Sequence, residues 1–237
     1  MVKEHVAALV AFARQEDPAL AAALTGVPAD EIRALEHARD IRLPASYRAF
    51  LEHMGRESGR FLLARGYEHR FDVIREIVQF LPRYFTIAVP NDDFVNDDGT
   101  APDYCLDLAR GGIHDARVVE IEQPPDVWRD GDRSFITFLT RAWFRCVVLE
   151  RQRCGEVFQL AASADAVVVA LRELGFVEAL PPLPTTRCLR RGAEDGALVM
   201  ESLGVVVEML SRDRDVFDRF PDARTLAHGV RPPRNSR

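Results

Sequence analysis

The stretch Ile32–Gly55, IRALEHARDIRLPASYRAFLEHMG, decides the fold that we expect for this chain. Ile32, Leu35 and Ala38 recur at helical spacing, which predicts a helix with one apolar face. Pro44 suits the first turn of a second helix, because its missing N–H would have no partner there. An apolar stripe at i, i+3, i+4 and i+7 continues that helix with Tyr47, Phe50, Leu51 and Met54. Two such helices need another layer to cover their apolar faces, and we expect a sheet.

The ends of both helices carry their own signals. Pro28 is followed by Asp30 and Glu31, and a fixed φ with two acidic residues favours a helix start. Gly55 is placed to end the second helix in the left-handed conformation. A further helix is expected over residues 2–14, where the apolar residues again share one face.

Three strand-like runs follow, over Phe85–Val89, Tyr104–Leu108 and Val118–Ile121, separated by turn-forming residues. We expect them to form an antiparallel sheet. Asp72 is a candidate N-cap for a helix before these strands, and Ser134 is one for a helix after them. Helices that flank a sheet predict an α+β fold.

The pattern starts again near residue 146. Strand-like runs over 147–149 and 157–160 precede a helix over 164–174 that Gly175 ends, and Asp195-Gly196 suggests a hairpin turn. We therefore expect a helical segment over 1–24, a main domain over 25–145, and a disordered tail over 230–237. Residues 146–229 are either an α/β extension of the main domain or a small second domain.

Composition limits the function. The 237 residues are 47% hydrophobic, enough for a substantial core, and no apolar run is long enough to cross a bilayer. We expect a cytoplasmic protein without a membrane partner. The net charge of −6 argues against nucleic acid and suits a basic protein partner. The four cysteines have no metal-ligand spacing, so we expect reduced thiols, no metal and no cofactor.

Charge is densest between Asn91 and Asp103, and its acids are Asp92, Asp93, Asp97, Asp98 and Asp103. A calcium loop with Gly99 at its sixth position would begin at Phe94 and end at Cys105, so both key carboxylates are absent. Two interpretations of the acidic segment remain. The segment is either a solvated loop of turn-forming residues, or a charged face that speeds encounter with a basic partner.

Trp128 lies in a segment that resembles a loop, where a large aromatic residue either anchors a partner or covers the edge of the core. It joins the five acids as a candidate partner-binding residue. No GxSxG, P-loop or GxGxxG motif occurs, and no nucleophile is placed beside a base. Cys105 alternates with Tyr104 and Leu106 in a strand and is best explained as a core residue. We therefore expect no enzymatic activity.

Three separated segments carry a family resemblance. They are LPASYRAFL (Leu43–Leu51), LPRYFTIA (Leu81–Ala88) followed by DYCLDL (Asp103–Leu108), and SFITFL (Ser134–Leu139). In order and spacing they resemble the SMI1/KNR4 family, also called the SUKH superfamily. The resemblance covers residues 25–145, and the acidic loop is longer than the family pattern.

The resemblance implies an α+β fold, with an antiparallel or mixed sheet packed against helices, that serves as a protein-binding module. Many bacterial members are immunity proteins that bind and neutralise a toxin, whereas fungal members regulate cell-wall synthesis and signalling. We expect an immunity protein that binds a basic toxin domain. A regulatory module without a toxin, or an unrecognised enzyme, are the alternatives.

Overall fold

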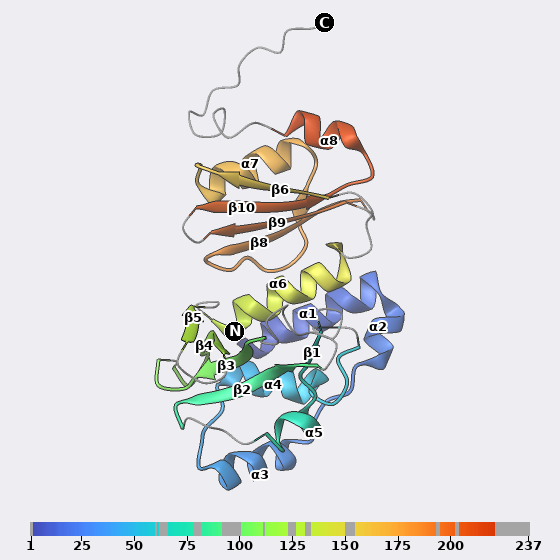
Figure 1. Ribbon diagram of the computed structural model, residues 1–237. Helices are drawn as coiled ribbons and strands as arrows, with labels where there is room; N and C mark the ends of the chain where they lie inside the picture. The colour runs from blue at the N-terminus through green and yellow to red at the C-terminus, as the bar shows by residue number, and fades with distance from the viewer. Residues whose placement is uncertain are drawn as a thin grey trace, which may run out of the picture. The chain divides into compact units, whose positions relative to one another are not determined.

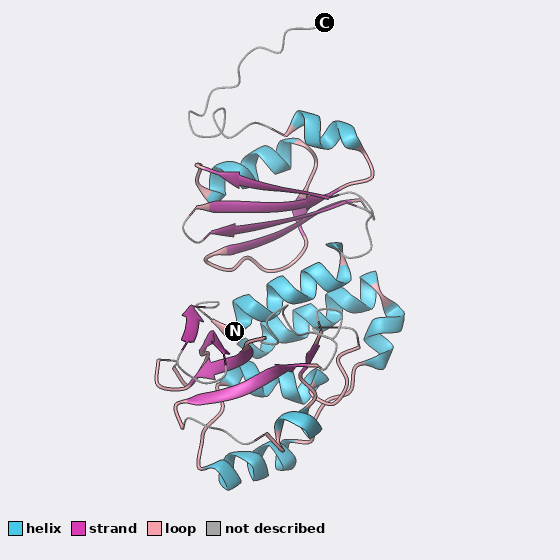
Figure 2. Ribbon diagram, in the orientation of Figure 1, coloured by secondary structure: helices cyan, strands magenta, loops and turns pink. Residues whose placement is uncertain are grey.

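The computed structural model describes residues 2–59, 61, 66–77, 82–91, 101–110, 112–122, 127–130, 134–149, 155–192, 195–201 and 204–220. The chain divides into two compact units, Met1–Cys146 and Val147–Arg237. Each unit combines helices with a five-stranded antiparallel sheet (Figures 1 and 2). The expected α+β fold, with sheets packed against helices, is confirmed.

The helices of the first unit are α1 (Val2–Glu16), α2 (Pro18–Ala23), α3 (Ala29–Arg39), α4 (Ala45–Met54), α5 (Phe71–Ile74) and α6 (Phe135–Val147). Asp17 caps α2 by accepting a hydrogen bond from the Leu20 N–H at 3.0 Å. The Ser134 hydroxyl accepts one from the Thr137 N–H at 3.1 Å, which confirms Ser134 as the predicted cap of α6. This first unit includes the N-terminal helices α1 and α2.

The joint between α3 and α4 is held by Glu36. Its carboxylate accepts hydrogen bonds from the Leu43 N–H at 2.8 Å and from the Arg48 guanidinium at 2.5 Å. Asp40 ends α3 in the left-handed conformation, with φ of 50°. Ile32 and Leu35 are buried as predicted, but Ala38 is exposed, so the apolar face of α3 is narrower than expected.

Two predicted helix ends are wrong. Gly55 has φ of −75°, so it does not supply a left-handed stop. A Cβ there would lie 2.8 Å from both the Cα and the carbonyl oxygen of Leu51, so close packing requires the glycine. Arg70, not Asp72, holds the N-cap position of α5, and Asp72 lies in the first turn, where it pairs with Arg56.

The strands of the first unit are β1 (Tyr67–Glu68), β2 (Tyr84–Pro90), β3 (Asp103–Asp107), β4 (Arg117–Glu122) and β5 (Val127–Asp130), in the order β1-β2-β3-β4-β5. β2, β3 and β4 confirm the predicted antiparallel strands. Trp128 lies in β5, so the prediction that it lies in a loop is wrong.

The three motif segments meet in one aromatic cluster between α4, α6 and β2. The Tyr47 ring lies 5.8 Å from that of Phe85 and 5.2 Å from that of Phe135, and the Phe50 ring lies 5.7 Å from that of Phe135. All four side chains are nearly fully buried. α1 joins the same core, because the Trp143 indole donates to the carbonyl of Leu9 at 2.9 Å.

The second unit contains β6 (Gly155–Leu160), α7 (Ala164–Glu173), β7 (Val177–Glu178), β8 (Thr186–Arg191), β9 (Asp195–Glu201), β10 (Val205–Leu210) and α8 (Arg214–Arg219), with strand order β6-β10-β9-β8-β7. α7 and α8 cover one face of this sheet (Figure 2). The core between them contains Val167, Leu171, Phe176, Val207 and Val216.

The predicted hairpin is confirmed, because β8 and β9 pair antiparallel, but its turn lies earlier than predicted. Asp195 and Gly196 begin β9, where Asp195 pairs with Arg191, and the turn before them includes Gly192 at φ of 62°. Asp195 is drawn into the strand because its buried carboxylate accepts hydrogen bonds from the Arg191 guanidinium and the Ser211 hydroxyl. Residues 147–149 form no strand, because α6 runs on through Val147.

Candidate functional site

The structure brings two of the six predicted partner-binding residues into one row of the first sheet. Asp103 opens β3 and pairs with Ile121 of β4, which pairs with Trp128 of β5. Their backbones are thus separated by a single strand. Asp92, Asp93, Asp97 and Asp98 lie outside the described residues, in the segment that leads into β3.

The sheet next to this row is tightly packed. Ile121, Cys105 and Val119 form a small buried cluster against which Tyr84 packs. Burial raises the pKa of the Cys105 thiol to about 12, so the thiol stays protonated and is a poor nucleophile. Cys105 is therefore a core residue, as predicted. Cys146 and Cys188 are also buried, and Cys154 falls outside the described part.

An ion pair between a partly exposed arginine and a buried aspartate lies at the other end of β3. The Arg83 guanidinium donates to both carboxylate oxygens of Asp107, at 2.8 and 2.5 Å, and the Ala109 and Arg110 N–H groups donate to one of them. Burial acts to raise the pKa of Asp107, but these hydrogen bonds outweigh it and hold that pKa below its usual value. Asp107 is an ionised structural anchor for the turn after β3.

A cleft of about 450 Å³ opens beside this ion pair. Its described lining includes Arg42 and Pro44 from the segment before α4, Arg83, and Ile113 from the β3–β4 connection. The connection is fixed to α4, because the first N–H groups of that helix, on Ala45 and Ser46, donate to the carbonyls of Ile113 and His114 at 3.0 Å. Ile113 is 60% exposed and offers an apolar contact at the rim.

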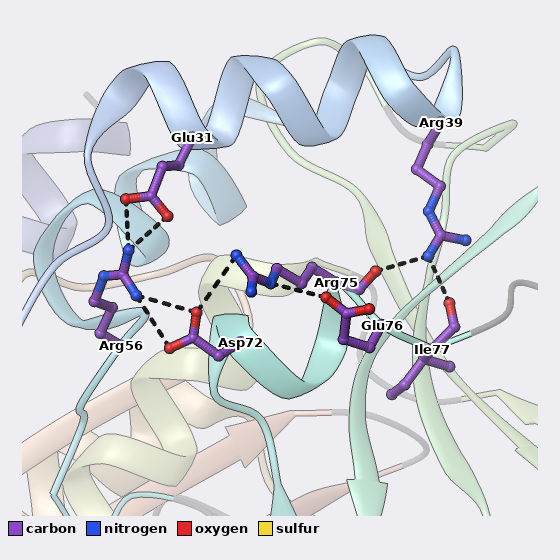
Figure 3. Close-up of polar contacts among 7 residues, drawn as sticks. All are labelled: Glu31, Arg39, Arg56, Asp72, Arg75, Glu76 and Ile77. Carbon is purple, nitrogen blue, oxygen red and sulfur yellow. Dashed lines mark hydrogen bonds and ion pairs between the residues drawn. The ribbon is translucent and has the colours of Figure 1, made fainter.

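A second hollow of about 300 Å³, which we call the α3–α5 groove, is bordered by a chain of alternating charges (Figure 3). Arg56 pairs with Glu31 of α3 and with Asp72 of α5, and Arg75 pairs with Asp72 and Glu76. Arg39 donates to the carbonyls of Arg75 and Ile77, both at 2.8 Å. Each exposed pair contributes little stability alone, but together they tie α3 to the segment that holds α5.

The floor of the α3–α5 groove is apolar, and its rim is charged. Leu35 and Phe71 are buried beneath it, while Ala34 and Ala38 are exposed on its α3 side. Small side chains there leave room for a partner's side chain, and charges of both signs surround it. Sequence analysis missed this groove; the available signal was the pair of alanines four residues apart, one of which we assigned to the core.

Among the described residues, the shortest contact between a hydroxyl and a histidine joins Ser58 and His69, and it is structural. The Ser58 hydroxyl and His69 Nε2 are hydrogen-bonded, but both residues are only 1% exposed and His69 packs against the rings of Phe50 and Phe61. Burial lowers the pKa of His69 to about 4, so the ring is neutral near pH 7. Because substrate has no access, this pair does not form a catalytic site.

Within the described ranges, no three His, Cys, Asp or Glu side chains are grouped closely enough to hold a metal ion. None of the helices in these ranges is both long and apolar enough to cross a membrane. Comparison with known proteins gives no match to a family and no match to a curated protein. The SMI1/KNR4 resemblance therefore stays a prediction.

Proposed function

We propose that this chain is a non-enzymatic protein-binding module of the SMI1/KNR4 type, and that it neutralises a bacterial toxin by stoichiometric binding. The observation that carries the proposal is the convergence of the three motif segments. Tyr47, Phe85 and Phe135 come from three separate segments and pack in one cluster. Such packing is expected if the segments together specify a single fold.

Because the aromatic motif residues are buried, they stabilise the fold and do not contact a partner. We therefore assign partner recognition to other residues, on the surface. Immunity by binding needs no reacting group; it needs a surface that covers the toxin's site and side chains that complement its charge. The acids Asp92, Asp93, Asp97 and Asp98 lead into Asp103, and the chain carries a net charge of −6. A basic toxin domain is the partner that this charge would attract.

The mechanism that we propose is steric occlusion aided by charge. The acidic segment attracts the partner, and the neighbouring row that ends at Trp128 provides contacts that do not depend on charge. Tryptophan is enriched among the residues that dominate binding energy, because it buries a large area. Such a protein would act in the cytoplasm, where the toxin would reach its target.

Growth rescue tests the proposal directly. Toxin domains sought among the genes that neighbour this one are each expressed with and without this chain, and the purified pair is analysed by light scattering. Rescue of growth together with a complex that contains equal numbers of the two chains would support immunity. Unchanged toxicity without a complex would contradict it and favour a regulatory module of the same fold. Rescue by a sub-stoichiometric amount of this chain would instead indicate catalysis.

A further inference from the structure

Among the described strands of the second sheet, β6 is an edge strand, with β10 as its one partner. It pairs with β10 along its whole length, in six consecutive pairs without a bulge, and it is the first strand in the order β6-β10-β9-β8-β7. Phe158 and Leu160 face the core and hold β6 in place. The ring centroids of Phe158 and Phe220 are 5.1 Å apart, and Leu160 is 4% exposed. One row of backbone N–H and C=O groups therefore faces away from β10.

This edge is less protected than the other sheet edges that the structure describes. Natural sheets protect their edges with short strands, prolines, charged side chains or bulges, and Glu156 is the one charged residue of β6. The opposite edge, β7, has two residues, and the edges of the first sheet, β1 and β5, have two and four. β6 has six residues, GEVFQL, with no proline and no basic residue. At its centre Val157 is 71% exposed, more than any other large hydrophobic residue that the structure describes.

We propose that β6 pairs antiparallel with β6 of a second copy of this chain, with Val157 opposite Val157 of that copy. A two-fold axis perpendicular to the sheet through this pair would join the two sheets into one and keep α7 and α8 of both copies on the same face. Closed two-fold association is the commonest form of protein oligomer. It would cover both open edges at once.

The sequence of β6 selects this register. With Val157 opposite itself, Glu156 lies opposite Phe158 and Gly155 lies opposite Gln159. A shift of two residues in one direction sets Glu156 against Glu156, which is unfavourable because like charges then face each other. A shift in the other direction sets Val157 against Gln159 and leaves the valine without an apolar partner. A shift of one residue would set core-facing side chains against outward-facing ones.

The mass of the full chain in solution tests the association. Light scattering on the wild type should give twice 26.7 kDa, and Val157→Lys should give a monomer, because it places two lysines face to face. Val177→Lys is the matched control: Val177 is a 65% exposed valine in the other edge strand, and this variant should remain dimeric. A monomeric wild type, or a Val157→Lys protein that remains dimeric, would overturn the proposal.

Disulfide trapping tests the register. In a Cys154→Ser background, which removes the thiol that directly precedes β6, Val157→Cys should form a cross-linked dimer under mild oxidation. Directly opposed residues in antiparallel strands have Cα atoms about 4.5–5.5 Å apart, which suits a disulfide. Gln159→Cys, opposite Gly155, should not cross-link, nor should Val177→Cys. Stronger cross-linking at residue 159 or 177 than at 157 would contradict the proposed pairing. Both outcomes are independent of toxin binding.

Discussion

Tyr47 and Phe135 meet edge to face, with ring centroids 5.2 Å apart and ring planes at 86°. The first residue belongs to the proline-linked helix α4 and the second opens α6. This contact joins two of the three motif segments, and Phe85 of the remaining one packs against the same tyrosine. The cluster is therefore the place where the fold of the first unit is most sensitive to substitution.

Tyr47→Ala should lower the free energy of unfolding of the first unit by about 4 kcal/mol, because it removes a fully buried ring from this cluster. Tyr47→Phe keeps the ring and should cost less than about 1.5 kcal/mol. Both tryptophans of the chain, Trp128 and Trp143, lie in the first unit, so urea unfolding followed by tryptophan fluorescence reports on it. Equal losses for the two variants would show that the ring packing is not the source of stability.

His69 should make the first unit less stable in mild acid. Its pKa is lowered by burial from 6.5 to about 4, so below pH 6.5 the unfolded chain binds a proton that the folded chain does not. Stability is therefore full above pH 6.5 and falls as the pH drops toward about 4. The loss should reach about 2 kcal/mol near pH 5.

His69→Phe should reduce the dependence of the free energy of unfolding on pH, whatever its effect on stability at neutral pH. His53→Gln, at an exposed histidine on α4, should leave it unchanged. The measurement is a series of urea unfolding curves between about pH 7.5 and pH 5. An unaltered slope in His69→Phe would assign the acid sensitivity to other groups.

Arg83→Met should destabilise the first unit by about 2 kcal/mol, because it leaves the carboxylate of Asp107 buried without its bidentate partner. The estimate is below that for a fully buried pair because the Arg83 side chain is 37% exposed. Arg42→Met is the control: Arg42 is exposed on the same cleft, and its replacement should cost less than about 0.5 kcal/mol. Thermal unfolding of both variants measures this difference, and equal losses of stability would contradict the role of the Arg83–Asp107 pair.

The acidic segment should govern the rate of partner association. Changing Asp92, Asp93, Asp97 and Asp98 to asparagine should slow binding of a basic toxin domain about tenfold at low salt, with a smaller effect at high salt. Stopped-flow mixing at several salt concentrations measures this.

A matched control removes four exposed acids elsewhere by changing Asp30, Asp165, Glu201 and Asp215 to their amides. If both variants slow association equally, net charge and not the acidic segment attracts the partner. If neither does, the segment is a solvated loop, as the other reading of the sequence holds.

Local patterns were sufficient where neighbouring residues decide the conformation. The stripe in α4, the cap at Ser134, the strands β2 to β4 and the glycine after α7 were all predicted, because each depends on side-chain periodicity or on one backbone preference. The identification of Cys105 as a core residue followed from strand alternation alone. None of these features needs information from distant parts of the chain.

Predictions failed where a distant contact overrides a local preference. Gly55 is required by its approach to Leu51 and not by a left-handed stop, and Asp195 is held in β9 by Arg191 and Ser211 and not in a turn. Trp128 enters a strand because β4 offers it a partner. Such distant partners cannot be predicted from the neighbouring residues in the sequence.

The sequence by itself determined most helices of the first unit, the central strands β2 to β4 and the apolar face of α4, because hydrophobic periodicity and caps act within a few residues. Tertiary structure alone decided that three motif segments share one aromatic cluster, that Asp103 and Trp128 lie in one row, and that α3 and α5 leave a groove between them. These features depend on pairing and packing between segments far apart in the chain, and such contacts form only when the whole unit folds.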